Sequence, residues 1–329
     1  CDKFLPLDIT SYQNEFLNYL EKKEWIREPK NLYEPIDYII QLSGKRIRPI
    51  LTLMAADILS GNQKQALPAA LAIEVFHNFT LIHDDIMDDA PIRRGQKTVH
   101  EKWDVNRAIL SGDAMLILAY QYFENYPPEI FQKLAKLFSK TALEVCDGQQ
   151  LDIDFETRNN VNIEEYLEMI RLKTSVLVAS ALKMGAIVAE ASEKDANLLY
   201  DYGLNLGIAF QLQDDYLDTF GDPNSFGKQL GGDIIENKKT YLFLKAMEIS
   251  DANDQQKLAF FYKQQLDDNS IKINEVKRIF ERCEIPTLIQ QLINEYTYKS
   301  FDSIKEMNIS SLNKEKLIDF GSFLMARNK

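Results

Sequence analysis

Two acidic motifs with the same spacing constrain this chain more than any other feature of its sequence. The first motif, D-D-I-M-D, runs from Asp84 to Asp88, and the second, D-D-Y-L-D, runs from Asp214 to Asp218. Each follows an apolar run that predicts a helix, and residues four apart on a helix share one face. The carboxylates at the first and fifth positions of each motif should therefore point the same way.

Carboxylates one helical turn apart repel each other unless a cation lies between them. Mg²⁺ commonly takes one or two protein carboxylates together with phosphate oxygens. A solvated acidic helix face is the alternative interpretation of a single motif. Two copies, both flanked by apolar residues, argue against that alternative, so the motifs predict sites for a hard divalent cation.

Composition narrows the classes of function. The chain has 329 residues and a net charge of −12, which argues against nucleic acid as a partner. An anionic substrate must then be recruited by local cations or metals. Three cysteines without metal-type spacing indicate a reducing compartment, and we expect a cytoplasmic protein. No uninterrupted apolar run reaches about 18 residues, so we expect no transmembrane segment.

Basic residues cluster at several points of this acidic chain. Lys45, Arg46 and Arg48 lie where Gly44 is expected to open a helix, and helix-terminal N–H groups next to cations favour an anion site. Surface solubility charges are the alternative explanation there. Further cations near the motifs of the sequence are Arg93, Arg94, Lys173, Lys228 and Lys238. This is more than one diphosphate needs, which indicates two phosphorylated substrates.

The hydrophobic pattern is helical almost throughout, without strand-like alternation of useful length. We expect an all-α fold, with long antiparallel helices around a central cavity and the two acidic helices facing each other across it. Residues 1–329 should form a single domain. The predicted helices cover about 8–24, 66–89, 105–124, 128–146, 163–190, 196–219 and several segments from 239 to 327, with one opened by Gly44.

Between about residues 40 and 242 the chain resembles the trans-isoprenyl diphosphate synthases of the polyprenyl synthetase family. The resemblance is carried by GKRIRP, HDDIMD with RRG, GDAML at 112–116, KT at 173–174, FQLQDDYLD, and GK with GGDIIENKKT, in that order. It implies an all-helical homodimer with the isoprenoid synthase-type bundle. It also implies that isopentenyl diphosphate is joined to an allylic diphosphate with about three Mg²⁺ ions per active site.

The resemblance also implies a role for each matching residue. Asp84 and Asp88, supported by Asp85, would bind Mg²⁺, and Asp214 would bind a further ion with Asp215 and Asp218 nearby. The isopentenyl diphosphate site would comprise Lys45, Arg48, His77 and Arg94. The allylic diphosphate site would comprise Arg93, Lys173, Thr174, Gln211, Lys228 and Lys238. The main catalytic contributions are expected from Asp84, Asp88, Asp214, Lys173 and Arg93.

Product length should depend on what closes the pocket beneath the first motif. Phe79 and Thr80 lie roughly 6–7.5 Å below Asp84 along the helix. A bulky Phe79 would limit growth, while a small Thr80 leaves space. This pair resembles synthases of the geranylgeranyl (C20) type, with farnesyl (C15) as the alternative. Phe79 could instead be an ordinary core residue with no effect on product length.

Three other functions share parts of this pattern. A class I terpene cyclase shares the first motif, but its second metal motif normally mixes Asn or Asp, Ser or Thr, and Glu. A non-catalytic partner subunit tends to lose motif residues, whereas this chain keeps them. Glu74-x-x-His77 has the spacing of di-iron bundles, but the second such pair that a di-iron site needs is missing.

Overall fold

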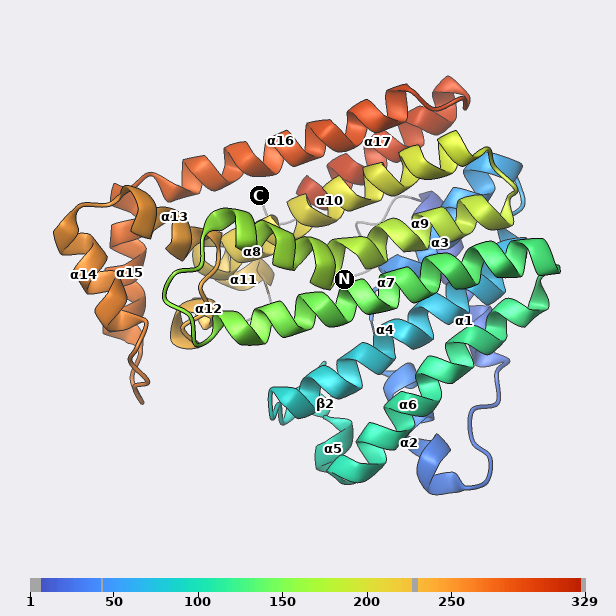
Figure 1. The fold of residues 1–329 in the computed structure, drawn as a ribbon, viewed down its shortest axis with the longest axis horizontal. Coiled ribbons are helices and arrows are strands. Elements are labelled where there is room, and N and C mark those ends of the chain that lie inside the picture. Colours follow the sequence, from blue (N-terminus) through green and yellow to red (C-terminus); the bar gives the residue numbers. More distant parts are fainter. Residues whose placement is uncertain (1–6, 43, 227–229, 327–329) are drawn as a thin grey trace. The chain divides into compact units, whose positions relative to one another are not determined.

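The structure is a computed structural model that describes residues 7–42, 44–226 and 230–326. Within these ranges the chain is helical apart from connecting segments and one two-stranded hairpin, formed by β1 (Ile92–Arg93) and β2 (Gln96–Lys97) (Figure 1). The predicted all-α class is confirmed. The apolar residues recur at helical spacing over most of the sequence, so helices are the elements that can bury them.

The chain divides into two compact units. Unit 1 comprises Cys1–Lys140 and Ser180–Asn197, and unit 2 comprises Thr141–Ala179 and Leu198–Lys329. Helices α7 (Pro128–Phe155), α9 (Val176–Val188) and α10 (Glu193–Phe220) each contain residues of both units. The expectation of a single domain remains a prediction.

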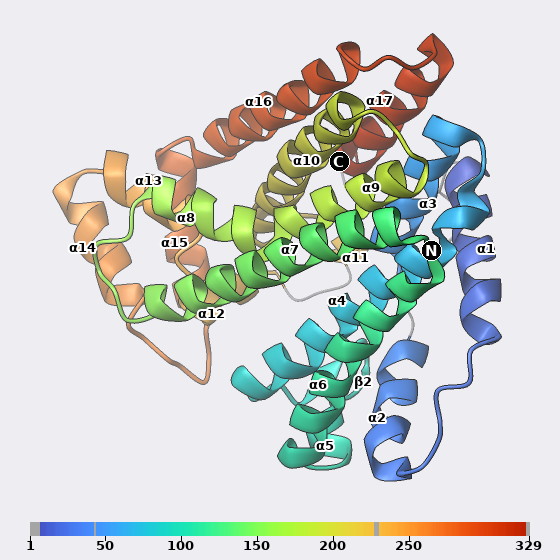
Figure 2. The same ribbon diagram turned by 45° about the vertical axis from the view of Figure 1, so that its right-hand side comes forward.

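Unit 1 is organised around helix α4 (Leu67–Met87), which packs against α3 and α6 (Figures 1 and 2). Pro68 is tolerated at the start of α4, and every residue from Ala69 to Phe76 is buried. The other elements of unit 1 are α1 (Leu7–Glu21), α2 (Lys30–Gln41), α3 (Ile47–Ser60), η2 (Gln63–Ala66), α5 (Val99–Lys102), α6 (Val105–Tyr122) and η3 (Phe123–Asn125).

Helix α4 also belongs to a stretch with the length and composition of a membrane span. Among the described residues, Gln63–Met87 is the one segment that passes this test, and 61% of its most apolar window is buried inside the fold. Polar residues interrupt this stretch, so counting only uninterrupted apolar runs in the sequence did not identify it. Its burial is that of a core helix.

Unit 2 buries its apolar side chains mainly between α13 (Tyr241–Ile249), α15 (Ser270–Arg282) and α16 (Ile285–Lys305). The hydroxyl of Tyr202 in α10 donates to the carbonyl of Leu317 (2.7 Å) and fastens the last helix. The remaining elements of unit 2 are α8 (Ile163–Ile170), η4 (Arg171–Ser175), α11 (Pro223–Phe226), α12 (Gly232–Ile235), α14 (Ala252–Phe261) and α17 (Ser311–Ala326).

Two of the differences between the predicted and the observed helices lie close together in the fold. The helix expected over 163–190 is interrupted by the π-helical turn Arg171–Ser175, and the helix expected to stop near 146 continues to Phe155. Gly148 connects the two differences. A side chain at Gly148 would place its Cβ 2.3 Å from the backbone nitrogen of Lys173, so only glycine lets α7 approach the π-helical turn this closely.

Replacing Gly148 with alanine should therefore destabilise the protein. Alanine is favoured over glycine inside a helix by about 1 kcal/mol. Forcing a methyl group against backbone atoms that cannot rotate away costs about 1–3 kcal/mol or more. Because the added Cβ would lie only 2.3 Å from a backbone nitrogen, the cost should fall near the upper end of this range, and we expect a net loss of about 1–2 kcal/mol in the free energy of unfolding, measured by chemical denaturation.

Asp147→Ala is the matched control, because Asp147 precedes Gly148 on the same helix and is exposed. It should change stability by no more than about 0.5 kcal/mol. A Gly148→Ala protein as stable as the wild type would show that the close approach does not constrain this position.

Candidate active site

The first acidic motif lies at the carboxyl end of α4. Asp84 is partly exposed within the helix, and Asp88 is exposed as its C-cap, with its N–H bonded to the carbonyl of Asp84 (2.9 Å). Asp85 is buried. Asp84 and Asp88 thus offer oxygen ligands to a hard cation such as Mg²⁺, whereas Asp85 turns into the protein.

Asp85 is held by Arg93 in a bidentate ion pair. The guanidinium nitrogens of Arg93 lie 2.7 and 2.8 Å from the two carboxylate oxygens of Asp85. Arg93 belongs to β1, so the pair connects the hairpin to the end of α4. Two parallel N–H···O bonds give strong geometric specificity. Sequence reasoning assigned these two residues to metal and phosphate, and their mutual pairing was not foreseen.

Arg48, His77 and Arg94 are gathered in unit 1 as the resemblance implies. Arg48 lies 3.3 Å from Nε2 of His77, and Arg94 donates to the carbonyl of Leu42 (3.3 Å). Gly44 leaves room for this arginine, since a Cβ there would lie 2.9 Å from the Arg94 guanidinium carbon. Lys45 is exposed just before α3.

Burial and the cations around His77 together determine its protonation. Burial lowers the pKa of His77 well below its usual value, and the nearby Arg48 and Arg94 lower it further. The imidazole is therefore neutral at neutral pH. Its Nε2 can accept a hydrogen bond from Arg48, which leaves the proton on Nδ1.

Arg46, which the sequence analysis placed in the same basic cluster, has a structural role. Its side chain is buried, lies 3.5 Å from Glu74, and donates to the carbonyls of Ile40 (2.6 Å) and Leu42 (3.1 Å). Burial lowers the pKa of Arg48 and of Arg94, and Arg46 adds to this effect on Arg94. Crowded cations of this kind favour the binding of an anion.

The second acidic motif lies in the part of α10 that belongs to unit 2. Asp215 is buried, accepts a hydrogen bond from the hydroxyl of Tyr166, and accepts another from Gln211 (3.1 Å). Burial raises the pKa of Asp215 well above its usual range, and the charges of Asp233 and Asp214 add to this effect. Tyr166 and Gln211 oppose the shift by donating hydrogen bonds.

Asp214 and Asp218 are partly exposed. A side-chain oxygen of Asp218 accepts from the backbone N–H of Asp233 (2.9 Å), which joins the motif to α12. Both motifs therefore have the same plan, with the second carboxylate buried and the first partly exposed. This division of roles fits oxygen coordination of Mg²⁺ by the first carboxylate of each motif.

Lys173 and Thr174 lie in the π-helical turn. Nζ of Lys173 lies 2.5 Å from Oδ2 of Asp152 in α7. π-Helical turns often occur at functional sites, because the extra residue redirects the side chains. Lys173 has apolar neighbours in sequence and therefore needs an anionic partner, which Asp152 provides. Asp152 lies in the run GQQLDID, to which the sequence analysis assigned no role.

Lys238 follows α12 and lies 3.4 Å from Glu236. Burial alone would lower the pKa of Lys238, but Asp233, Glu236 and Asp152 together raise it above its usual value. Asp152 thus pairs with Lys173 and helps to raise the pKa of Lys238, and both lysines are predicted to bind the allylic diphosphate. Lys228, the remaining member of that predicted set, lies outside the described residues.

Phe79 and Thr80 are both partly buried on α4. The ring centroid of Phe79 lies 5.6 Å from that of Phe76 and 4.8 Å from that of His83. Phe76 in turn packs on Phe138, with centroids 5.0 Å apart. Phe79 is thus a partly buried member of an aromatic cluster, a position compatible with either a pocket floor or plain core.

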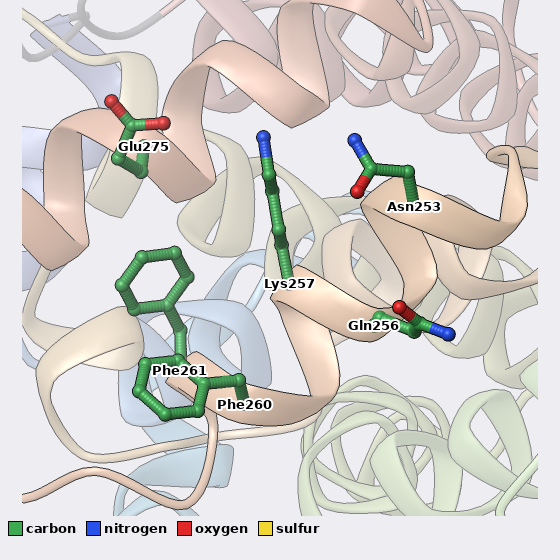
Figure 3. A pocket seen from close by; sticks show the side chains of 6 residues that line it. All are labelled: Asn253, Gln256, Lys257, Phe260, Phe261 and Glu275. Atoms are coloured by element: carbon green, nitrogen blue, oxygen red, sulfur yellow. The ribbon is translucent and has the colours of Figure 1, made fainter.

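A shallow cavity of about 410 Å³ lies elsewhere in unit 2, between α14 and α15 (Figure 3). Its lining residues include no residue of either acidic motif and none of the predicted substrate ligands. They are Asn253, Gln256, Lys257, Phe260, Phe261 and Glu275. This cavity is therefore not the candidate active site.

The neutral state of His77 predicts a specific pH dependence of stability. Below about pH 6.5 an unfolded histidine binds a proton that folded His77 does not bind, so the wild type loses stability as the pH falls. His77→Gln removes this titration, and glutamine can still accept from Arg48. Between about pH 7.5 and about pH 5.5 the wild type should lose about 1.4 kcal/mol more than the variant.

The measurement is urea denaturation of both proteins at several pH values. The variant at about pH 7.5 serves as its own baseline, so a general destabilisation does not affect the comparison. Parallel pH profiles would show that folded His77 titrates normally.

Comparisons with known proteins identify the family to which the chain belongs. The family model described as polyprenyl synthetase matches residues 29–281. The chain is 45% identical over 226 residues to the geranylgeranyl diphosphate synthase of Methanosarcina mazei, covering 68% of this chain and 69% of that protein. It is 40% identical over 241 residues to the geranylfarnesyl diphosphate synthase of Natronomonas pharaonis, covering 68% and 71%.

A solved structure extends the similarity over nearly the whole chain. The crystal structure of a geranylgeranyl pyrophosphate synthase matches with a TM-score of 0.93 and 52% sequence identity, covering 98% of this chain and 99% of that one. The chain therefore belongs to the polyprenyl synthetase family, a family of trans-prenyltransferases.

Proposed function

We propose that this protein is a short-chain trans-prenyltransferase that condenses isopentenyl diphosphate with allylic diphosphates and yields geranylgeranyl diphosphate. The observation that carries the proposal is the pairing of two acidic motifs of the same plan with two separate groups of cations. The names of the similar proteins support the C20 product. We propose that residues 1–329 act as one domain.

The isopentenyl diphosphate would bind at Lys45, Arg48, His77 and Arg94. Arg48 and Arg94 supply positive charge that the nearby Glu74 only partly offsets. Neutral His77 has its Nδ1 proton available for a phosphate oxygen. Lys45 is exposed and long enough to close over the bound anion.

The allylic diphosphate would bind through Mg²⁺ at Asp84, Asp88 and Asp214, with Asp218 nearby. We propose that Asp85 and Asp215 mainly hold their motifs in place, because each is buried against its own partner. The direct ligands would be Arg93, Lys173, Thr174, Gln211, Lys228 and Lys238. About three Mg²⁺ ions per site are expected, and when bound they would neutralise the diphosphate and stabilise its charge as it leaves.

The protein side chains would act mainly by positioning and electrostatics. Lys173 and Lys238 would place positive charge beside the leaving diphosphate, and Asp152 would restrict the orientation of Lys173. The isopentenyl double bond would attack the allylic carbocation, and the condensed carbocation so formed would lose a proton to the released diphosphate. Apolar residues of α4 would exclude water that could quench the cation.

Phe79 would set the product length, with Thr80 leaving space beside it. The hydroxyl of Thr80 donates to the carbonyl of His77 (2.6 Å), so this polar group is satisfied and does not obstruct an apolar chain. A C15 product is the alternative, if another residue closes the pocket nearer the motif.

We further propose a cytoplasmic homodimer. Helix α6 exposes Leu110 and Ile117, which lie seven residues apart on one helix face. Such a stripe suits burial against a second copy of the chain.

The first test is a product assay. The protein with Mg²⁺ and isopentenyl diphosphate receives dimethylallyl, geranyl or farnesyl diphosphate in separate reactions, and the products are sized after phosphatase treatment. We expect a C20 alcohol from each primer.

Asp84→Ala should reduce turnover by at least about 100-fold, because it removes stabilisation of the departing charge.

Glu124→Ala is the matched control, since Glu124 is an exposed acidic residue elsewhere in unit 1. Circular dichroism should show intact helices in both variants. A hydrocarbon formed from an allylic diphosphate alone would identify a terpene cyclase instead. No turnover with any primer would support a non-catalytic partner subunit.

Phe79→Ala should lengthen the product beyond C20 by opening space toward Phe76. Phe79→Tyr keeps the ring and should retain the C20 product. Product lengths measured in the same assay decide the matter. If the alanine variant still stops at C20, Phe79 is a core residue and the floor lies elsewhere.

A further inference from the structure

Three metal-ligating side chains outside the predicted ligand set meet at the base of the β1–β2 hairpin. Asp89 directly follows α4, and His100 and Glu101 belong to α5. Nε2 of His100 lies 3.9 Å from Oδ1 of Asp89 and 4.0 Å from Oε1 of Glu101. All three ligand atoms lie within 4.8 Å of one another.

His100 gives the cluster its significance. Its side chain is only 5% exposed, and neither ring nitrogen has a hydrogen-bond partner among the described residues. Buried polar groups are nearly always bonded, and leaving one unsatisfied costs about 1–3 kcal/mol. A buried imidazole whose Nε2 faces two carboxylates is therefore missing a partner that both the ring and the acids can bind.

A metal ion fits this description. Nitrogen and oxygen ligands lie about 2.0–2.2 Å from a zinc-like ion, so atoms about 4 Å apart can share one after small adjustments. The carboxylates can make these adjustments, because the side chains of Asp89 and Glu101 are 95% and 47% exposed. An imidazole with two carboxylates suits Zn²⁺, Mn²⁺ or Co²⁺ better than Mg²⁺, which prefers oxygen ligands alone.

We propose that Asp89, His100 and Glu101 form a transition-metal site separate from the Mg²⁺ ligands Asp84 and Asp88. The proposal does not depend on the prenyltransferase reaction.

The place of the site in the fold suggests what the ion would do. It would connect the two ends of the segment that carries Arg93 and Arg94. The same base is already closed by Thr98, whose side chain donates to the carbonyl of Ala90 (2.7 Å) and whose N–H donates to that of Pro91 (3.1 Å). A bound ion would add a third connection and stabilise the hairpin.

The test is a Zn²⁺ titration of the metal-stripped full-length protein by calorimetry, in excess Mg²⁺ to occupy the oxygen-only sites. Co²⁺ absorption reports on the coordination of the same site. We expect one Zn²⁺ per chain. His100→Gln should weaken this binding at least tenfold, and Asp84→Asn should leave it unchanged, because Asp84 is not a ligand of the new site.

The double variant Asp89→Asn/Glu101→Gln alters only exposed side chains and decides the matter if His100→Gln does not fold. It should also lose Zn²⁺ binding, and Zn²⁺ should raise the melting temperature of the wild type alone. Equal Zn²⁺ affinity in the double variant and the wild type would overturn the proposal. So would binding that is lost in Asp84→Asn but kept in His100→Gln.

Discussion

Crowding of like charges at the end of α4 is the constraint to which much of unit 1 is adapted. Four aspartates lie within six residues, and four arginines lie nearby in the fold. Left unpaired in a partly buried region, either set would be costly. The protein neutralises part of each set internally, through Asp85 with Arg93 and Arg46 with Glu74. The other carboxylates and guanidinium groups can then take part in the proposed ligand sites, and Arg93 can do so through the N–H groups that do not bond Asp85.

Unit 2 meets the same constraint with different chemistry. Its buried aspartate, Asp215, accepts hydrogen bonds from a phenol and an amide instead of an arginine. Neutral donors offset less negative charge, which is why burial and neighbouring acids still raise the pKa of Asp215. The second cluster is thus held in place while remaining strongly attractive to cations. The cation Lys173 is restrained in turn by Asp152.

Two features of the candidate site require a neighbouring group to lie very close to the backbone of a glycine. The sequence shows the glycine but does not show which group approaches it. Gly148 reads as a possible end of a helix, because glycine is unfavourable in helix interiors. In the structure it lies inside α7, against the π-helical turn that carries Lys173. Gly44 likewise reads as a helix start, whereas α3 begins at Ile47 and Gly44 makes room for Arg94. Neither distinction follows from local propensity.

By itself, the sequence determined the helical class, the spacing of the two acidic motifs and the residue types near them. These properties are local, because a period of 3.6 residues and a four-residue offset need no knowledge of the rest of the chain. Only the tertiary structure decided which side chain pairs with each buried aspartate. Asp85 and Arg93 are eight residues apart, whereas Tyr166 and Asp215 are 49 apart. The second aspartate of each motif is buried against a partner that the helical period does not identify, whereas the first aspartate is partly exposed.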